Sequence, residues 1–290
     1  MRKFAASLAV AAIAVSACSA KPAGNAQEPA ASNSLQSSTA PLPISLTRLD
    51  CGHAEFKDMN GFFSDRPGVY PPGPGKVTDS CYLIRHGDQQ MVWDTGLPAE
   101  TKSKPMNENG MVASIDRTLA DQLQQVGVKP DDVDVLGISH MHGDHIGQAA
   151  QFTNARLFIG KRDFQMLEGK PNDTLKGWRT QGKPVTLISN DTDVFGDGSV
   201  VALHLPGHTP DHLALLVNLK SGPVLLSGDL YHSTIAREKK AVPGFNTSRE
   251  QTLASMDKFE AIARKTGAKV IIQHEPNDIA KLPSFPQAAE

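Results

Sequence analysis

One stretch decides how this sequence is interpreted: residues 138–147, which read ISHMHGDHIG. It holds His140, His142 and His145 together with Asp144, and it directly follows the apolar run VDVLGI. A short, branched apolar run of this kind is typical of a buried strand. Loops that follow buried strands carry functional side chains, because the sheet holds them in place. We therefore expect a functional centre at this strand end.

Other candidate ligands also follow apolar runs. His208 comes after VVALHL, Asp229 after PVLLSG and His274 after VIIQ. Neutral imidazole and carboxylate are the ligands that Zn²⁺ and similar divalent ions prefer. Residues of a metal-binding type thus follow four separate predicted strands, and this pattern predicts a metal centre.

The spacing of these residues suggests two ions. His140 and His142 are two residues apart and point the same way from an extended segment, whereas Gly143 turns the chain before Asp144. A carboxylate with two oxygens is suited to bridge a pair of ions. The predicted ligands are His140, His142 and His208 for one ion, Asp144, His145 and His274 for the other, and Asp229 between both.

The pattern resembles the metallo-β-lactamase superfamily. The resemblance rests on the HMHGDH motif, on the order His208, Asp229, His274, and on Asp94-Thr95-Gly96 after a strand. It extends from about residue 44 to residue 276. It implies an α/β protein: an αββα sandwich of two mixed sheets with helices on the outer faces and a dinuclear metal site at one edge.

The resemblance also implies a reaction. A hydroxide held between two divalent ions, expected to be Zn²⁺, attacks a carbonyl at neutral pH. Asp229 argues against the true β-lactamases of the superfamily, which generally lack a bridging carboxylate. The flanks LDCG, VWDTGLP and SGDLYH look most like the N-acyl-homoserine lactonase group. The expected function is hydrolysis of such lactones or of related lactones and esters. The alternatives are a glyoxalase-II-like thioesterase, a β-lactam hydrolase, or an exported metal-binding protein with little catalysis.

Three residues are candidates for catalytic roles. Asp144 is suited to carry a proton to the leaving ring oxygen. The similar lactonases have a tyrosine three residues after the bridging aspartate, where it helps to hold the substrate carbonyl. Here Tyr231 is second after Asp229 and His232 is third. Either residue is a candidate for that role. Phe62, Phe63, Tyr70, Met106 and Met111 are candidates for an apolar lip that contacts an acyl chain.

Composition narrows the range of partners. The chain has 290 residues and a formal net charge of −2, so it gives no electrostatic argument for nucleic-acid binding. A small-molecule substrate is the expected partner. The composition carries no indication of oligomeric state.

The N-terminus predicts export. A basic start and an apolar segment over residues 4–15 form a signal peptide, residues 1–17, which is too short to span a membrane. Val15-Ser16-Ala17-Cys18 resembles a bacterial lipobox, which predicts a periplasmic lipoprotein that meets the membrane only through a lipid on Cys18. The alternative is cleavage after Ala17 or Ala20 and a soluble periplasmic product. Residues 18–40 are predicted to be a disordered tether, and residues 41–290 the hydrolase domain.

The sequence also bears on the pairing of two cysteines and on the positions of several strands and helices. In an oxidising compartment Cys51 and Cys81 form either a disulfide or two separate buried thiols, and both possibilities stay open. Strands over 80–86 and 89–96 are predicted to join at a Gly87-Asp88 turn. Apolar periodicity predicts helices over 115–126 and from Ser248 to about Gly267.

Overall fold

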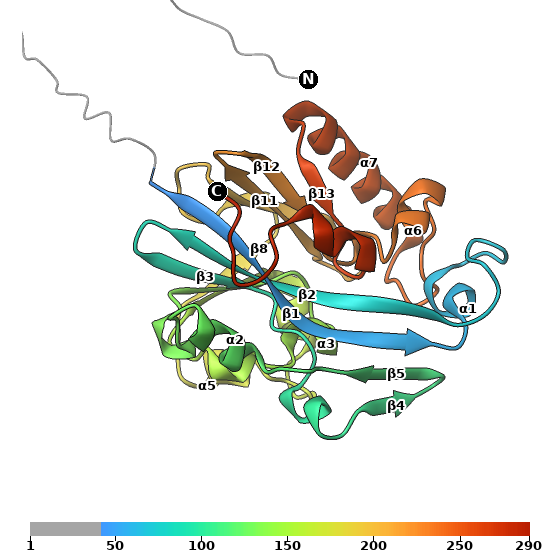
Figure 1. Ribbon diagram of the computed structural model, residues 1–290, viewed down its shortest axis with the longest axis horizontal. Helices are drawn as coiled ribbons and strands as arrows, with labels where there is room; N and C mark the ends of the chain where they lie inside the picture. Colours follow the sequence, from blue (N-terminus) through green and yellow to red (C-terminus); the bar gives the residue numbers. More distant parts are fainter. Residues whose placement is uncertain (1–41) are drawn as a thin grey trace, which may run out of the picture. The chain divides into compact units, whose positions relative to one another are not determined.

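The computed structural model describes residues 42–290, which form two β-sheets packed face to face with helices on the outer faces (Figure 1). The predicted αββα sandwich is therefore confirmed. The predicted signal peptide, residues 1–17, and the tether, residues 18–40, lie outside the described residues. Within residues 42–290, no helix is long and apolar enough to cross a membrane.

The first sheet has eight strands in the order β4-β5-β1-β2-β3-β6-β7-β8. Its strands are β1 (Ile44–Phe56), β2 (Gly75–His86), β3 (Gln89–Trp93), β4 (Met106–Glu108), β5 (Met111–Ser114), β6 (Val135–Ile138), β7 (Arg156–Gly160) and β8 (Val185–Ile188). The second sheet has five strands in the order β13-β12-β11-β10-β9. Its strands are β9 (Thr192–Asp193), β10 (Val200–His204), β11 (Leu213–Leu219), β12 (Gly222–Leu226) and β13 (Lys269–Ile271).

Seven α-helices and five short 3₁₀ helices connect these strands in the described part of the chain. The α-helices are α1 (Met59–Phe63), α2 (Leu119–Gln125), α3 (Gly143–Ile146), α4 (Lys161–Met166), α5 (Lys176–Thr180), α6 (Thr234–Lys239) and α7 (Arg249–Thr266). The 3₁₀ helices are η1 (Ala99–Lys102), η2 (Pro130–Asp132), η3 (Ala149–Gln151), η4 (Gly228–Leu230) and η5 (Pro276–Lys281).

Strand direction explains where the histidine-rich loop lies. β1, β2 and β3 pair antiparallel, and the predicted turn at Gly87-Asp88 joins β2 to β3. β3, β6, β7 and β8 pair parallel, and every residue of β6 is buried. Parallel strands are covered on both faces and therefore have continuous apolar sequences. The loops that follow β3 and β6, which contain Asp94 and His140, consequently meet at one edge of the sheet.

Three apolar layers hold the sandwich together. Trp93 of the first sheet and Leu215 of the second belong to the core between the sheets. Trp178 of α5 packs with the outer face of the first sheet, and Met256 and Phe259 of α7 pack with the second. Each such side chain contributes about 1.5–3 kcal/mol when it is fully buried.

The two predicted helices form, but one is shorter than expected. The structure begins α2 at Leu119 rather than near Ile115, because the Thr118 side chain caps the helix by accepting a hydrogen bond from the Asp121 backbone. Ile115 instead joins a separate apolar cluster with α1. The predicted capping residue Ser248 does begin α7.

Cys51 and Cys81 are joined by a disulfide with a Cα–Cα distance of 5.7 Å, which decides between the two possibilities that the sequence left open. Both residues are fully buried, Cys51 in β1 and Cys81 in β2. Gly96 packs directly on this bridge, since a Cβ there would lie 2.5 Å from the Cys51 Cβ. The disulfide thus supports the loop that contains Asp94.

Candidate metal centre

The predicted metal ligands converge from separate strand ends. His140 and His142 lie between β6 and α3, and His208 lies between β10 and β11. Asp229 is in η4 after β12, and His274 follows β13. Residues far apart in the sequence therefore meet because two sheets deliver their loops to the same place.

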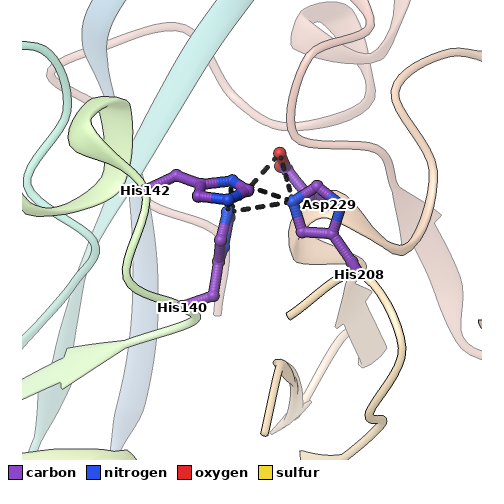
Figure 2. A group of neighbouring side chains, drawn as sticks. All are labelled: His140, His142, His208 and Asp229. Atoms are coloured by element: carbon purple, nitrogen blue, oxygen red, sulfur yellow. Dashed lines mark hydrogen bonds and ion pairs between the residues drawn. The ribbon is translucent and has the colours of Figure 1, made fainter. Parts of the chain in front are cut away.

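The first cluster contains three imidazoles and one carboxylate (Figure 2). The Nε2 of His140 lies 2.9 Å from the Nδ1 of His142, and the Nε2 of His208 lies 3.1 Å from each of these atoms. The Oδ2 of Asp229 lies 3.3 Å from the Nε2 of His208. This is the set that the sequence predicted for one ion, with the bridging carboxylate facing it.

The second cluster contains Asp144, His145 and His274. The Oδ1 of Asp229 lies 3.2 Å from the Nε2 of His145 and 2.9 Å from the Nε2 of His274. Asp144 lies at the solvent side, with its Oδ2 3.8 Å from the Nε2 of His274. The two oxygens of Asp229 therefore face different clusters.

The outward-facing ring nitrogens show why these groups suit a cation. The Nδ1 of His208 bonds to Oδ1 of Asn246, and the Nδ1 of His140 lies 3.1 Å from the Ser139 hydroxyl. With the ring proton on Nδ1, both Nε2 atoms direct lone pairs at one point. The Nε2 of His145 and Oδ1 of Asp229 are buried and have no hydrogen-bond partner among the described residues. Nitrogen and oxygen donors arranged in this way fit divalent ions such as Zn²⁺.

Outer hydrogen bonds orient the second cluster in the same manner. The Nδ1 of His145 lies 3.0 Å from Oδ2 of Asp94, whose other oxygen accepts a hydrogen bond from the Ser139 backbone. The Nδ1 of His274 donates to the backbone carbonyl of Thr78. Such partners fix the ring orientation of metal-binding histidines. The sequence indicated Asp94 only as part of a familiar motif, not as the partner of His145.

The local charges differ between the two clusters. Burial lowers the pKa of His140 well below its usual value and that of His142 to about 4, so both rings are neutral at pH 7. Burial also acts to lower the pKa of His274, but Asp229 and Asp144 outweigh it and raise this pKa to about 9. The carboxylates thus favour a positive charge beside the second cluster. A bound divalent cation satisfies the same demand and displaces the proton.

The two carbonyl-binding candidates lie in different places. The Nε2 of His232 lies 3.2 Å from Oδ2 of Asp229, and its ring stacks on that of His274. The hydroxyl of Tyr231 instead donates to Glu260, and its ring packs against Phe259 in the core under α7. The structure therefore places His232 beside the cluster and Tyr231 away from it. The reason is that neighbouring residues after η4 point to opposite sides of the chain.

Two further residues, His212 and Phe245, lie next to the predicted ligands. His212 accepts a hydrogen bond from the Asp229 backbone through Nε2 and contacts the Leu205 carbonyl through Nδ1, so it supports the bridging residue and does not face the ions. Phe245 is 46% exposed, and its ring centroid lies 5.8 Å from that of His208. The sequence did not mark Phe245, because a single aromatic residue in a loop has no periodic context.

An αββα sandwich with two adjoining His/Asp clusters at its strand ends defines a protein with a two-part metal centre. The chain belongs to the metallo-beta-lactamase superfamily, whose family model matches residues 74–274.

The chain is similar to N-acyl homoserine lactonases. It is 30% identical to AttM of Azorhizobium caulinodans over 224 residues, which cover 71% of this chain and 84% of that protein. It is 27% identical to an N-acyl homoserine lactonase of Bacillus sp over 227 residues, which cover 74% of this chain and 89% of that protein.

Solved structures share the fold. A quorum-quenching N-acyl homoserine lactone hydrolase has a TM-score of 0.72 at 21% identity, with 86% of this chain and 99% of that chain covered. AidC, described as a dizinc quorum-quenching lactonase, has a TM-score of 0.63 at 19% identity, with 85% and 90% covered. The likeness to these two structures supports the predicted fold.

Proposed function

We propose that the protein is a metal-dependent hydrolase that opens the lactone ring of N-acyl homoserine lactones or of related lactones and esters, and that it quenches quorum signals. The observation that carries this proposal is the position of Asp229, with one oxygen toward each cluster. Similarity to proteins named N-acyl homoserine lactonases supports the substrate class. The reaction consumes one water, breaks the ring C–O bond and gives an open hydroxy acid.

The residues of the chain have separate roles in the proposed reaction. Two divalent ions, which we propose to be Zn²⁺, would activate the attacking water and polarise the substrate carbonyl when bound. Asp144 takes up a proton and passes it to the ring oxygen as the ring opens. Burial acts to raise the pKa of Asp144, but His145 and His274 outweigh it and lower the pKa. The carboxylate is therefore ionised at neutral pH and ready to accept a proton.

His232 holds the substrate carbonyl in this proposal. A cavity of about 350 Å³ adjoins the second cluster, and both His232 and His274 line it together with Tyr70 and Ser233. The Tyr70 hydroxyl lies 3.0 Å from the Ser233 hydroxyl, so the wall beside His232 is polar. A lactone and its amide need such polar groups for orientation.

An apolar lip lies on the other side of His232. The predicted lip residues Phe63 and Tyr70 are buried in their own cluster, whereas Phe62 is partly buried and packs with Phe245 at a ring-centroid distance of 5.6 Å. Phe245 in turn lies beside His232 and His208. We propose that an acyl chain contacts Phe62 and Phe245 as it leaves the centre.

A substrate panel tests this function. The metal-loaded protein is assayed with N-acyl homoserine lactones, a simple γ-lactone, a thioester and a β-lactam, and products are identified by mass. The proposal expects the lactones to be opened with the highest kcat/KM. Efficient cleavage of a thioester or β-lactam, with no lactone opened, would contradict it while leaving the fold and the metal centre intact.

We also propose that residues 1–17 direct export to the periplasm, that Cys18 carries a lipid, and that residues 18–40 tether the domain, residues 41–290, to the membrane. The lipobox-like sequence before Cys18 supports this. Wild-type protein should fractionate with membranes, and Cys18→Ala should release it or leave it unprocessed. A soluble wild-type protein whose mature chain begins at Lys21 would reject the lipid anchor.

A further inference from the structure

Asp163 is a buried carboxylate that no step above requires. It lies in the first turn of α4, directly after β7, and its side chain is fully inaccessible to solvent. Its Oδ2 accepts a 2.5 Å hydrogen bond from the Thr209 hydroxyl, and its Oδ1 accepts a 3.0 Å bond from the Asp211 backbone. Both partners belong to the loop that contains His208.

The same loop is held to α4 by a reciprocal contact. The Oδ2 of Asp211 accepts a hydrogen bond from the Arg162 backbone, and its Oδ1 accepts two from the Arg162 guanidinium. Gly160 allows this approach, because a Cβ at that position would collide with the Asp211 carbonyl. The start of α4 and the loop around His208 therefore form one rigid unit.

Asp163 also reaches the other histidine-bearing loop of the first cluster. The Met141 backbone faces Asp163 and acts to lower the pKa of its carboxyl, although burial outweighs this and raises the pKa. Met141 lies between His140 and His142. A backbone hydrogen bond from the Leu213 N–H to the Ser139 carbonyl joins the two loops next to their strands. Asp163 thus bonds directly to the His208 loop and faces the backbone of the loop that bears His140 and His142.

We propose that Asp163 is a positioning residue that sets His208 relative to His140 and His142 and thereby determines the affinity of the first ion. Asp94 has the corresponding role in the second cluster, because its Oδ2 lies 3.0 Å from the Nδ1 of His145 and orients that ring. The inference rests on the proposed ligand roles. A buried carboxylate that accepts two bonds from the His208 loop fixes that loop against α4, because its loss leaves buried donors unpaired.

Stepwise metal titration tests the proposal. Metal-free wild-type protein and Asp163→Ala are titrated with Zn²⁺ against a chromophoric chelator, which gives a dissociation constant for each ion. Loss of an outer partner typically costs about 10–100-fold in metal affinity. We expect this loss for the first ion and an unchanged second ion. Asp163→Asn, which keeps one acceptor oxygen, should give an intermediate loss.

Cobalt spectra identify the affected ion. With one equivalent of Co²⁺, the absorption spectrum of Asp163→Ala should match that of His208→Ala and differ from that of His274→Ala. Thr209→Val removes a single bond to Asp163 at constant shape, and should weaken the same ion even if Asp163→Ala does not fold. Asp193→Ala is the matched control, since Asp193 accepts backbone bonds from Gly196 and Gly198 in a remote turn.

The outcomes separate this inference from the proposed function. Equal weakening of both ions, or a lower Tm with both affinities unchanged, would mean that Asp163 only packs, and would overturn the inference. If wild-type protein binds two ions and His208→Ala loses one, the ligand roles stand whatever Asp163 does. Wild-type protein that binds fewer than two ions would overturn both.

Discussion

The Oδ1 of Asp229 lies 2.9 Å from the Nε2 of His274, yet this buried oxygen has no hydrogen-bond partner among the described residues. Its other oxygen faces His208 at 3.3 Å. A buried carboxylate oxygen without a hydrogen bond is costly unless a cation satisfies it. The relationship between Asp229 and His274 is therefore best explained by an ion between them.

Asp229→Asn should reduce the metal content from two ions per chain toward one. The second ion should be lost first, because the first retains three buried or nearly buried imidazoles, whereas the second retains two imidazoles and the partly exposed Asp144. Elemental analysis after dialysis measures this, with Asp193→Ala as a control that should keep both ions. A variant that retains two tightly bound ions would show that Asp229 is not the bridge.

His232→Ala should lower kcat/KM for N-acyl homoserine lactones by roughly 10–100-fold at unchanged metal content. A lost polar contact to the carbonyl costs about 1–3 kcal/mol. Tyr231→Phe is the neighbouring control: it removes only the hydrogen bond to Glu260 and should cost about 1 kcal/mol of stability with little change in kcat/KM. The opposite ranking of the two variants in kcat/KM would reject our assignment.

Phe245→Ala should raise KM more for long acyl chains than for short ones. Each methylene that Phe245 covers contributes up to about 0.8 kcal/mol, so a decanoyl substrate should lose more than a butanoyl one. Leu187→Ala serves as the control, because Leu187 is similarly exposed on the edge strand β8. A chain-length profile identical to that of the wild-type protein would exclude Phe245 from the lip.

Replacing both Cys51 and Cys81 with alanine should lower the free energy of unfolding by about 2–4 kcal/mol. The bridge closes a loop between residues 30 positions apart and so restricts the unfolded chain. Urea unfolding with and without a reductant measures the effect. If the reductant changes the midpoint of the double variant as much as that of the wild-type protein, the stabilisation does not come from this disulfide.

The fold was predicted through the resemblance to the metallo-β-lactamase superfamily, and the proposed ligand set through the spacing and order of its residues. The HMHGDH motif has its residues within six positions, and His208, Asp229 and His274 each follow a recognisable apolar strand. Local spacing is then enough to indicate a shared site. To this ligand set the structure added which oxygen of Asp229 faces which cluster.

Other features depend on tertiary contacts that no local pattern contains. The direction of Tyr231 follows from the irregular turn at η4, where Gly228 has a φ of +51°. No local pattern in the sequence marks Asp163, which only the folded chain brings to Thr209. Strands β4 and β5 have three and four residues, which is too short for an alternating pattern to indicate them.

The most direct test of the central claim is to measure lactone opening while Zn²⁺ is added back to metal-free protein. The open N-acyl homoserine is quantified by chromatography at each metal equivalent. We predict no turnover without metal and a rate that reaches its plateau at two equivalents per chain. Full activity in the metal-free protein, or no ring opening with two ions bound, would contradict the account.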